Sequence, residues 1–162
     1  MKNELNRLRI SQTSRPLDVV RFWSKEGDLL LSPPYQRGDV WGIKRQRNLI
    51  KSILLGIPIP SIIVNDRGSA CWDGDYRIAV IDGKQRITAI LKFLNDELSV
   101  HGEWFGMENE FVIYSQLPIP RQRGIKNHPI PFSEGQLATI EDEREVFDLV
   151  NFGGVQQGES DI

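Results

Sequence analysis

The chain has 162 residues, of which 40% are hydrophobic and 26% are charged, a composition typical of one soluble globular domain. No apolar run approaches the ~18 residues that a membrane span needs, and the N-terminal segment lacks the apolar core of a secretory signal, so we expect a cytoplasmic protein with no membrane partner. The single cysteine, Cys71, excludes an internal disulfide and a zinc site built from several cysteines.

The net charge of −2 is distributed unevenly along the chain. Residues 1–57 hold 11 basic and 5 acidic side chains, whereas residues 134–162 hold 1 basic and 8 acidic ones. A basic segment favours contact with a polyanion such as DNA. In a homo-oligomer, the acidic stretch of one copy would face the basic half of another. The simpler alternative is two solvated helices of opposite charge.

Local sequence signals predict alternating helices and strands in the first third of the chain. Residues 1–15 are polar and are expected to form a flexible arm. A helix over 16–27 begins at a proline and ends at a glycine, and a short strand over 29–32 follows it. Two prolines and a glycine make 33–41 a loop. A helix over 43–55 carries its apolar residues on one face.

The middle of the chain predicts a hairpin followed by a helix. Strands over 58–65 and 76–82 flank a turn rich in glycine and aspartate. A helix over 84–95 begins directly after the second strand.

The last third of the chain is less regular in its pattern. Residues 111–117 and 136–140 are predicted as strands, and the four prolines in 118–135 predict an irregular segment between them. A last helix over 141–150 carries acids in its first turn, which suits the positive end of the helix dipole.

The mixture of hairpin links and helices predicts an α+β fold, with a small mixed sheet flanked by helices. We expect one domain over residues 16–155, followed by a C-terminal tail over 156–162.

The stretch VIDGKQRIT, residues 80–88, passes from a strand through a turn into a helix. Gly83 lets backbone N–H groups at the positive helix end face a ligand, and Lys84 and Arg86 add charges that suit phosphate oxygens. Asp82 would repel phosphate unless a metal lay between them, so it is a candidate Mg²⁺ ligand or the acceptor that orients a water or a ribose hydroxyl. The glycine spacing of a P-loop is missing. Alternatively, Asp82 caps the helix and the two cations are solvated.

A second candidate group, Tyr35, Gln36 and Arg37, follows two rigid prolines. Tyr35 could stack on a base and Arg37 could pair with phosphate. The alternative is that Tyr35 and Trp41 pack the loop against the core while Arg37 is a surface charge.

A third group lies in the last predicted helix. Phe147 and Asn151 are four residues apart and therefore share one helix face. The pair Gly153-Gly154 permits close approach of the backbone to a ligand. On its own, this pattern is also that of an ordinary helix C-terminus.

Together these stretches resemble the ParB/sulfiredoxin-like superfamily. More closely, they are similar to the domain with a DGQQR motif at the N-terminal end of GmrSD-type modification-dependent restriction enzymes. The resemblance is carried, in family order and over about 120 of the 162 residues, by the segments SPPYQRGDVW, LLGIPIPSI, VIDGKQRIT and VFDLVNFGG.

The resemblance implies a domain that binds and often hydrolyses a nucleoside triphosphate with Mg²⁺ and acts with DNA in restriction or phage defence. Asp82 and Arg86 would be its catalytic residues, with Asp82 as the metal-linked one. Position 84 is lysine where the family usually has glutamine, which leaves hydrolysis open. The nucleotide site that the resemblance implies consists of Tyr35, Gln36, Arg37, Asp82, Gly83, Lys84, Gln85, Arg86, Phe147 and Asn151.

Two other hypotheses stay open beside a Mg²⁺-dependent NTPase. Restriction members of the family continue into a separate nuclease domain, and this sequence shows no H-N-H-type motif. We therefore consider a non-catalytic nucleotide- or DNA-binding module that acts in trans with a partner nuclease. The third hypothesis is a small ParB-like DNase in which Asp73, Asp75 and Asp82 share a metal.

Overall fold

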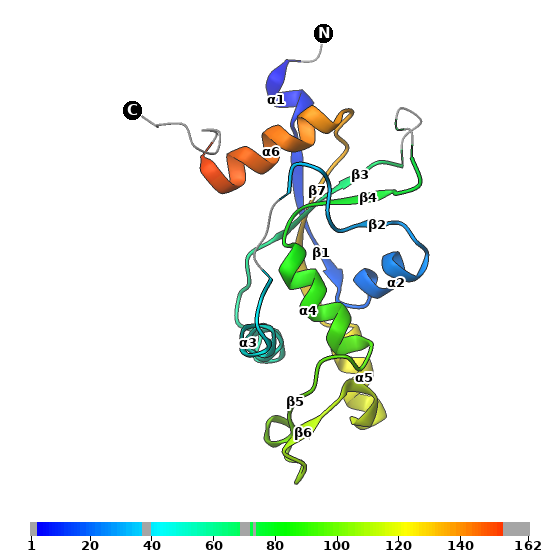
Figure 1. The fold of residues 1–162 in the computed structure, drawn as a ribbon, viewed down its shortest axis with the longest axis vertical. Helices are drawn as coiled ribbons and strands as arrows, with labels where there is room; N and C mark the ends of the chain where they lie inside the picture. Colours follow the sequence, from blue (N-terminus) through cyan, green and yellow to red (C-terminus); the bar gives the residue numbers. More distant parts are fainter. Residues whose placement is uncertain (1–2, 37–39, 69–71, 73, 154–162) are drawn as a thin grey trace.

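A five-stranded mixed sheet, in the strand order β1-β7-β3-β4-β2, forms the centre of the fold (Figure 1). The computed structural model describes residues 3–36, 40–68, 72 and 74–153. The β1–β7 and β3–β4 pairs are antiparallel, and the β7–β3 and β4–β2 pairs are parallel. The strands of this sheet are β1 (Ile10–Pro16), β2 (Leu29–Leu30), β3 (Ile62–Asp66), β4 (Ile78–Asp82) and β7 (Pro129–Gly135).

Helices surround this sheet, which confirms the predicted α+β class with a mixed sheet. In Figure 1, α1 and α6 lie at one end of the molecule, α5 and a two-stranded sheet lie at the other, and α4 runs between the two ends. The remaining elements are α1 (Glu4–Arg7), α2 (Val19–Lys25), α3 (Ile43–Leu54), α4 (Lys84–Leu94), β5 (Val100–His101), η1 (Gly102–Phe105), β6 (Phe111–Val112), η2 (Tyr114–Gln116), α5 (Ile119–Lys126) and α6 (Ile140–Phe152).

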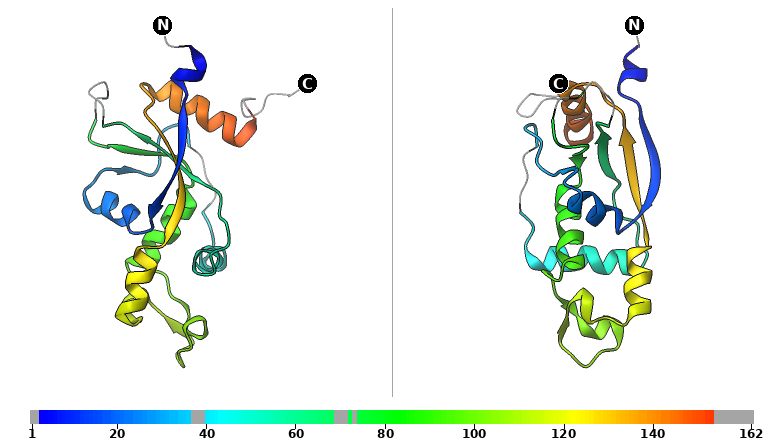
Figure 2. Two further views of the ribbon diagram at one scale, coloured as in Figure 1. Left: turned by 180° about the vertical axis from the view of Figure 1, so that it is seen from behind. Right: turned by 90° about the vertical axis from the view of Figure 1, so that its right-hand side faces the viewer.

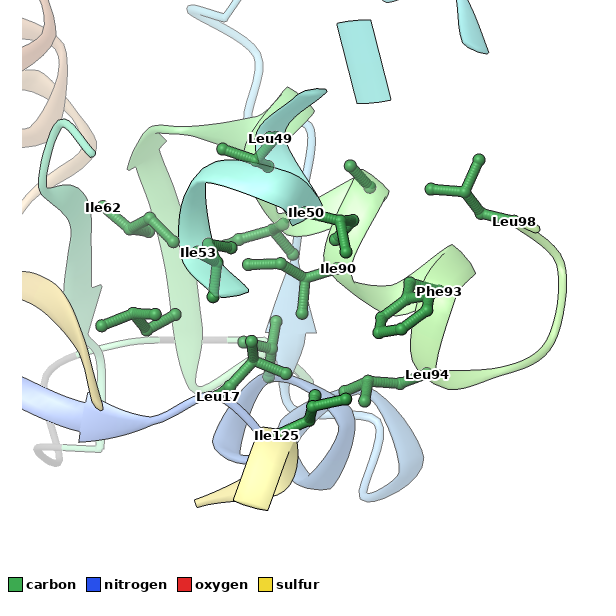
Figure 3. Close-up of a cluster of buried hydrophobic side chains, with 14 of the residues drawn as sticks. Leu17, Leu49, Ile50, Ile53, Ile62, Ile90, Phe93, Leu94, Leu98 and Ile125 are labelled. Atoms are coloured by element: carbon green, nitrogen blue, oxygen red, sulfur yellow. The ribbon is translucent and has the colours of Figure 1, made fainter. Parts of the chain in front are cut away.

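The main hydrophobic core lies between the sheet and α2, α3, α4 and α5 (Figure 3). Ile50 on α3, Ile90 on α4 and Ile62 on β3 are at most 1% exposed. β4 is buried at four consecutive residues, because it lies between β3 and β2 and is covered on both faces. This burial fixes the strand that leads into the Asp82-Gly83 turn.

A smaller core cluster lies under α6 and is formed by Ile81, Leu137 and Val146. Tyr35 and Phe147 pack against its edge. Ile81 is the residue before Asp82, so this cluster attaches α6 to the end of β4.

The predicted flexible arm over residues 1–15 is wrong for most of its length, because Glu4–Arg7 forms α1 and Arg7 pairs with Glu145 on α6 at 2.9 Å. Ile10–Pro16 forms β1, which pairs along its whole length with β7 (Figure 2). The polar composition of β1 reflects its place at the edge of the sheet, where most of its side chains are exposed. The expected tail over 156–162 lies outside the described residues.

The prediction of an irregular segment over 118–135 is also wrong. Pro118 and Pro120 stand at the N-terminal end of α5, where a missing N–H has no cost. Pro129 and Pro131 belong to β7 before it meets β3, whose pairing begins at Phe132. The strand therefore tolerates both prolines, because no N–H is required there for the β3 ladder.

The predicted hairpin over 58–65 and 76–82 is confirmed as the antiparallel pair β3–β4. The predicted strand over 111–117 is confirmed only in part, and the one over 136–140 is wrong. Only Phe111–Val112 of 111–117 is a strand, and the 3₁₀ turn η2 follows it. Residues 136–139 connect β7 to α6 instead of forming a strand, and Leu137 there bonds to the side chain of Asn65. In the described part of the chain, no helix is long and apolar enough to cross a membrane.

Candidate functional site

The turn from β4 into α4 strongly favours a glycine at position 83. Gly83 has φ 100° and ψ 17°, a left-handed conformation that residues with a side chain rarely adopt. A Cβ atom at this position would lie 3.2 Å from Cγ1 of Ile62 and 3.2 Å from a guanidinium nitrogen of Arg86. The chain therefore turns tightly beneath its own Arg86 side chain.

The N-terminus of α4 has no side-chain cap among the described residues, and its first turn contains no acid. The first residue of this helix is Lys84, whose carbonyl oxygen accepts a hydrogen bond from Thr88 Oγ1 at 2.8 Å. Free N–H groups at a helix N-terminus attract anions, and the helix dipole adds to that attraction. The alternative that Asp82 caps this helix is therefore wrong.

Asp82 instead holds Arg86. The Nη2 atom of Arg86 donates to Asp82 Oδ2 at 3.1 Å and to the carbonyl oxygen of Ser61 at 3.1 Å. The side chains of Asp82 and Arg86 are only 28% and 13% exposed, respectively. The acid and the carbonyl group thus fix the guanidinium group at the mouth of the turn.

Gln36 attaches the loop before α3 to the end of β4. Its amide nitrogen donates to the carbonyl oxygens of Ile81 at 3.0 Å and Val80 at 3.3 Å. Because a group that faces two carbonyl oxygens must be a donor, the orientation of the amide is fixed by its partners. The side-chain oxygen of Gln36 is buried and has no partner among the described residues.

The far end of the loop is held by two glutamines. Gln85 Oε1 accepts from the backbone N–H of Trp41 at 3.2 Å, and Gln46 donates to the carbonyl oxygen of Trp41 at 2.9 Å. The guanidinium group of Arg45 lies 4.6 Å from the centre of the Trp41 ring, a cation–π contact. Trp41 is thereby fixed between α3 and α4.

α6 supplies the opposite wall. Asn151 donates to the carbonyl oxygen of Phe147 at 2.9 Å, one turn earlier in the helix. The ring of Phe147 lies 5.6 Å from the ring of Tyr35 at an angle of 53°. Phe147 therefore connects α6 to the loop that carries Gln36.

These elements enclose a cleft of about 320 Å³, which is at the small end of the usual range for small-molecule sites. Three cationic side chains and one acid face it, so its net charge suits an anionic ligand. The lining residues are Gln36, Trp41, Arg45, Asp82, Gly83, Lys84, Gln85, Arg86, Phe147 and Asn151.

The cleft brings together the predicted site residues from three separate segments, with two exceptions. Tyr35 does not line it, because its hydroxyl group donates to Glu143 at 3.0 Å and its ring packs on Phe147. Burial, and then the neighbouring Glu143 carboxylate, raise the pKa of the Tyr35 hydroxyl above its ordinary value. Arg37 lies outside the described residues.

Two lining residues, Trp41 and Arg45, are not among the predicted site residues. The sequence indicates Trp41 only as a packing residue of the loop. The signal that points to Arg45 is its position four residues after Trp41, in the first turn of α3. Glu143, which holds Tyr35, is also absent from the predicted site.

Of the three acids expected to share a metal, Asp73, Asp75 and Asp82, the two that the structure describes, Asp75 and Asp82, lie too far apart to do so. Asp75 lies before β4 begins and Asp82 is its last residue, and five strand residues span roughly 15 Å. Asp73 lies outside the described residues. Among the described residues, no group of three or more histidine, cysteine or acidic side chains is placed to hold a metal.

The fold and the site define an α+β domain with a cationic cleft at a strand-to-helix turn. The chain belongs to the family of N-terminal domains of GmrSD restriction endonucleases, whose family model matches residues 21–162. No relative was found among curated protein sequences.

One solved structure to which the chain is similar is a C-terminally truncated chromosome-partitioning protein ParB from Caulobacter crescentus, complexed with CTP-gamma-S. The sequences are 14% identical, and the TM-score is 0.44. The match covers 94% of this chain and 56% of the ParB chain.

Proposed function

We propose that the cleft binds a nucleoside triphosphate, and that the domain hydrolyses it in a reaction linked to DNA. The observation that carries the proposal is the turn at Gly83, where an uncapped helix N-terminus stands beside Lys84 and the fixed guanidinium group of Arg86. A triphosphate presents several anionic oxygens, and this combination of backbone N–H groups and cations suits them.

The cleft also presents groups that suit the rest of a nucleotide. Trp41 and Phe147 supply apolar ring surface, on which a base can stack. The amides of Gln36 and Asn151 supply polar groups at the same cleft. Apolar walls with a few fixed polar groups are typical of small-molecule sites.

The residues present fit Mg²⁺ only together with phosphate. Asp82 is the one carboxylate among the described residues that line the cleft, and Mg²⁺ is commonly held by one or two carboxylates together with substrate phosphates and water. A bound Mg²⁺ would neutralise phosphate charge. The chain's own part would be to orient the phosphates through Lys84 and Arg86 and to place the Asp82 carboxylate beside them.

DNA is the proposed partner because the family is named for a restriction endonuclease. The helix α3, whose Arg45 lines the cleft, also carries the exposed side chains of Lys44 and Lys51. Such exposed cations favour contact with DNA phosphates. A role in restriction of foreign DNA, including phage DNA, would follow from this coupling.

The test is phosphate release from each of the four ribonucleoside triphosphates with Mg²⁺, with and without duplex DNA. Asp82→Ala should abolish release. Asp75→Ala, which removes an exposed acid at the other end of β4, should leave release unchanged. Equal release from wild type and Asp82→Ala would show that Asp82 is not part of the catalytic apparatus.

A second candidate function is a nucleotide-binding module without hydrolysis that acts with a partner nuclease. The ion pair between Asp82 and Arg86 favours it, because the carboxylate is already engaged in holding Arg86. This candidate predicts nucleotide binding without phosphate release. Release above the Asp82→Ala control would exclude it.

A further inference from the structure

Glu143 is a fully buried acid near the start of α6. Its Oε1 atom accepts hydrogen bonds from Asn65 at 2.8 Å and from Arg67 Nε at 2.7 Å. Its Oε2 atom accepts from Arg67 Nη2 at 2.6 Å and from the Tyr35 hydroxyl group at 3.0 Å. Four donors, two of them from one guanidinium group, offset the cost of burying the carboxylate.

This carboxylate joins three parts of the chain that are distant in sequence. Asn65 and Arg67 lie at the end of β3 and just after it, Tyr35 lies in the loop before α3, and Glu143 lies on α6. The guanidinium group of Arg67 also stacks on Trp72 at 4.1 Å. We call the contacts of Glu143 with Tyr35, Asn65 and Arg67 the junction. The stacking on Trp72 holds Arg67 in place on the β3 side of this junction.

Both walls of the cleft depend on this junction, although Glu143 does not line the cleft. Glu143, Phe147 and Asn151 are spaced four residues apart and share one face of α6. On the other wall, Tyr35 precedes Gln36, whose amide bonds to β4. Moving Glu143 would move both walls.

We infer that Glu143 is a positioning residue for the cleft, which it arranges in advance of ligand binding by holding Tyr35 and α6. The inference rests on the proposed function. If the Tyr35–Glu143 bond is lost, only a fraction of the molecules keep the loop in place, and the apparent Kd rises by the inverse of that fraction. A single buried hydrogen bond corresponds to roughly a fivefold change in such an equilibrium.

The experiment compares Tyr35→Phe with Tyr114→Phe. Tyr35→Phe removes the bond to Glu143 but keeps the ring against Phe147. Tyr114→Phe removes a comparable bond, to the carbonyl oxygen of Gln122 at 2.9 Å, on η2 away from the cleft. The Kd of each of the four ribonucleoside triphosphates with Mg²⁺ is measured by calorimetry, beside the urea midpoint of each variant.

Tyr35→Phe should raise the Kd of the nucleotide by up to roughly fivefold, whereas Tyr114→Phe should bind like wild type even if its urea midpoint falls equally. Glu143→Gln, if it folds, should weaken binding at least as much as Tyr35→Phe. In the double variant the two effects should combine to less than their product, because both changes act on the same contact between Tyr35 and position 143. Wild-type affinity in Tyr35→Phe, or effects that multiply in the double variant, would overturn the inference.

Hydrogen exchange separates this inference from the proposed function. The backbone N–H of Gln36 donates to the carbonyl oxygen of Pro33 at 3.0 Å within the loop. Its exchange should be faster in Tyr35→Phe than in Tyr114→Phe, whether or not any nucleotide binds. Unchanged exchange would refute the role of Glu143, whereas faster exchange in a protein that binds no nucleotide would refute only the proposed function.

Discussion

Replacing Gly83 with alanine tests how tightly the turn is built. The left-handed conformation of Gly83 costs an L-residue ~1 kcal/mol. The new Cβ would also lie 3.2 Å from Ile62 Cγ1, 3.4 Å from Ile62 Cα and 3.2 Å from Arg86 Nη2. Because the backbone of Ile62 lies in the buried strand β3, it cannot move away without cost, and such crowding typically adds ~2 kcal/mol.

Gly83→Ala should therefore lower the free energy of unfolding by about 3 kcal/mol, or the melting temperature by roughly 6–12 °C. Gly27 is the matched control, since it has φ 75° and nothing lies within 4 Å of the place that a Cβ would take, so Gly27→Ala carries only the conformational cost of ~1 kcal/mol. Urea unfolding of the two variants measures both numbers. Equal destabilisation would refute the close packing of the turn.

Three further predictions concern the charged and polar contacts. Tyr35 has a raised pKa in the folded protein, so the stability it contributes is complete below about pH 10 and falls as the pH rises above that value. In urea unfolding from pH 9 to 11, the unfolding free energy of Tyr35→Phe should therefore decline less steeply than that of wild type, by up to ~1.4 kcal/mol per pH unit. An identical decline would contradict the buried hydroxyl group. Glu143→Ala leaves the cation of Arg67 buried without its partner and should lower the free energy of unfolding, measured in urea, by about 3–5 kcal/mol. A loss below ~1 kcal/mol would show that Glu143 and Arg67 do not form a buried ion pair. By contrast, the ion pair of Arg77 with Asp66 is solvent-exposed on the arginine side. Arg77→Ala should therefore change the unfolding free energy by less than ~1 kcal/mol in the same assay. A larger loss would contradict a solvated ion pair.

The parts of the site that depend on local rules could be predicted from the sequence. The Asp82-Gly83 turn, the start of α4 at Lys84 and the shared helix face of Phe147 and Asn151 each follow from spacing within a few residues. The resemblance to the family then placed these segments in one site, and the structure brings them to one cleft.

The parts that depend on distant partners could not be predicted in this way. A glutamate in a helix rich in acids is expected in water, and Glu143 is buried because distant donors meet it, among them Arg67 from 76 residues away in sequence. Similarly, the prolines of β7 indicate irregular structure until β1 and the late start of β3 pairing are known. Tyr35 was expected at a ligand, but the same distant acid holds its hydroxyl group instead.

The measurement that tests the central claim most directly is calorimetric titration of each ribonucleoside triphosphate, with Mg²⁺, into three proteins. These are the wild type, Arg86→Gln, and Arg123→Gln as a control that removes an exposed cation on α5. At least one nucleotide should bind wild type and Arg123→Gln equally and bind folded Arg86→Gln at least ~10-fold more weakly, because a charged hydrogen-bond donor at the turn is lost. Binding by no nucleotide, or equal binding by Arg86→Gln, would contradict a nucleotide site at this turn.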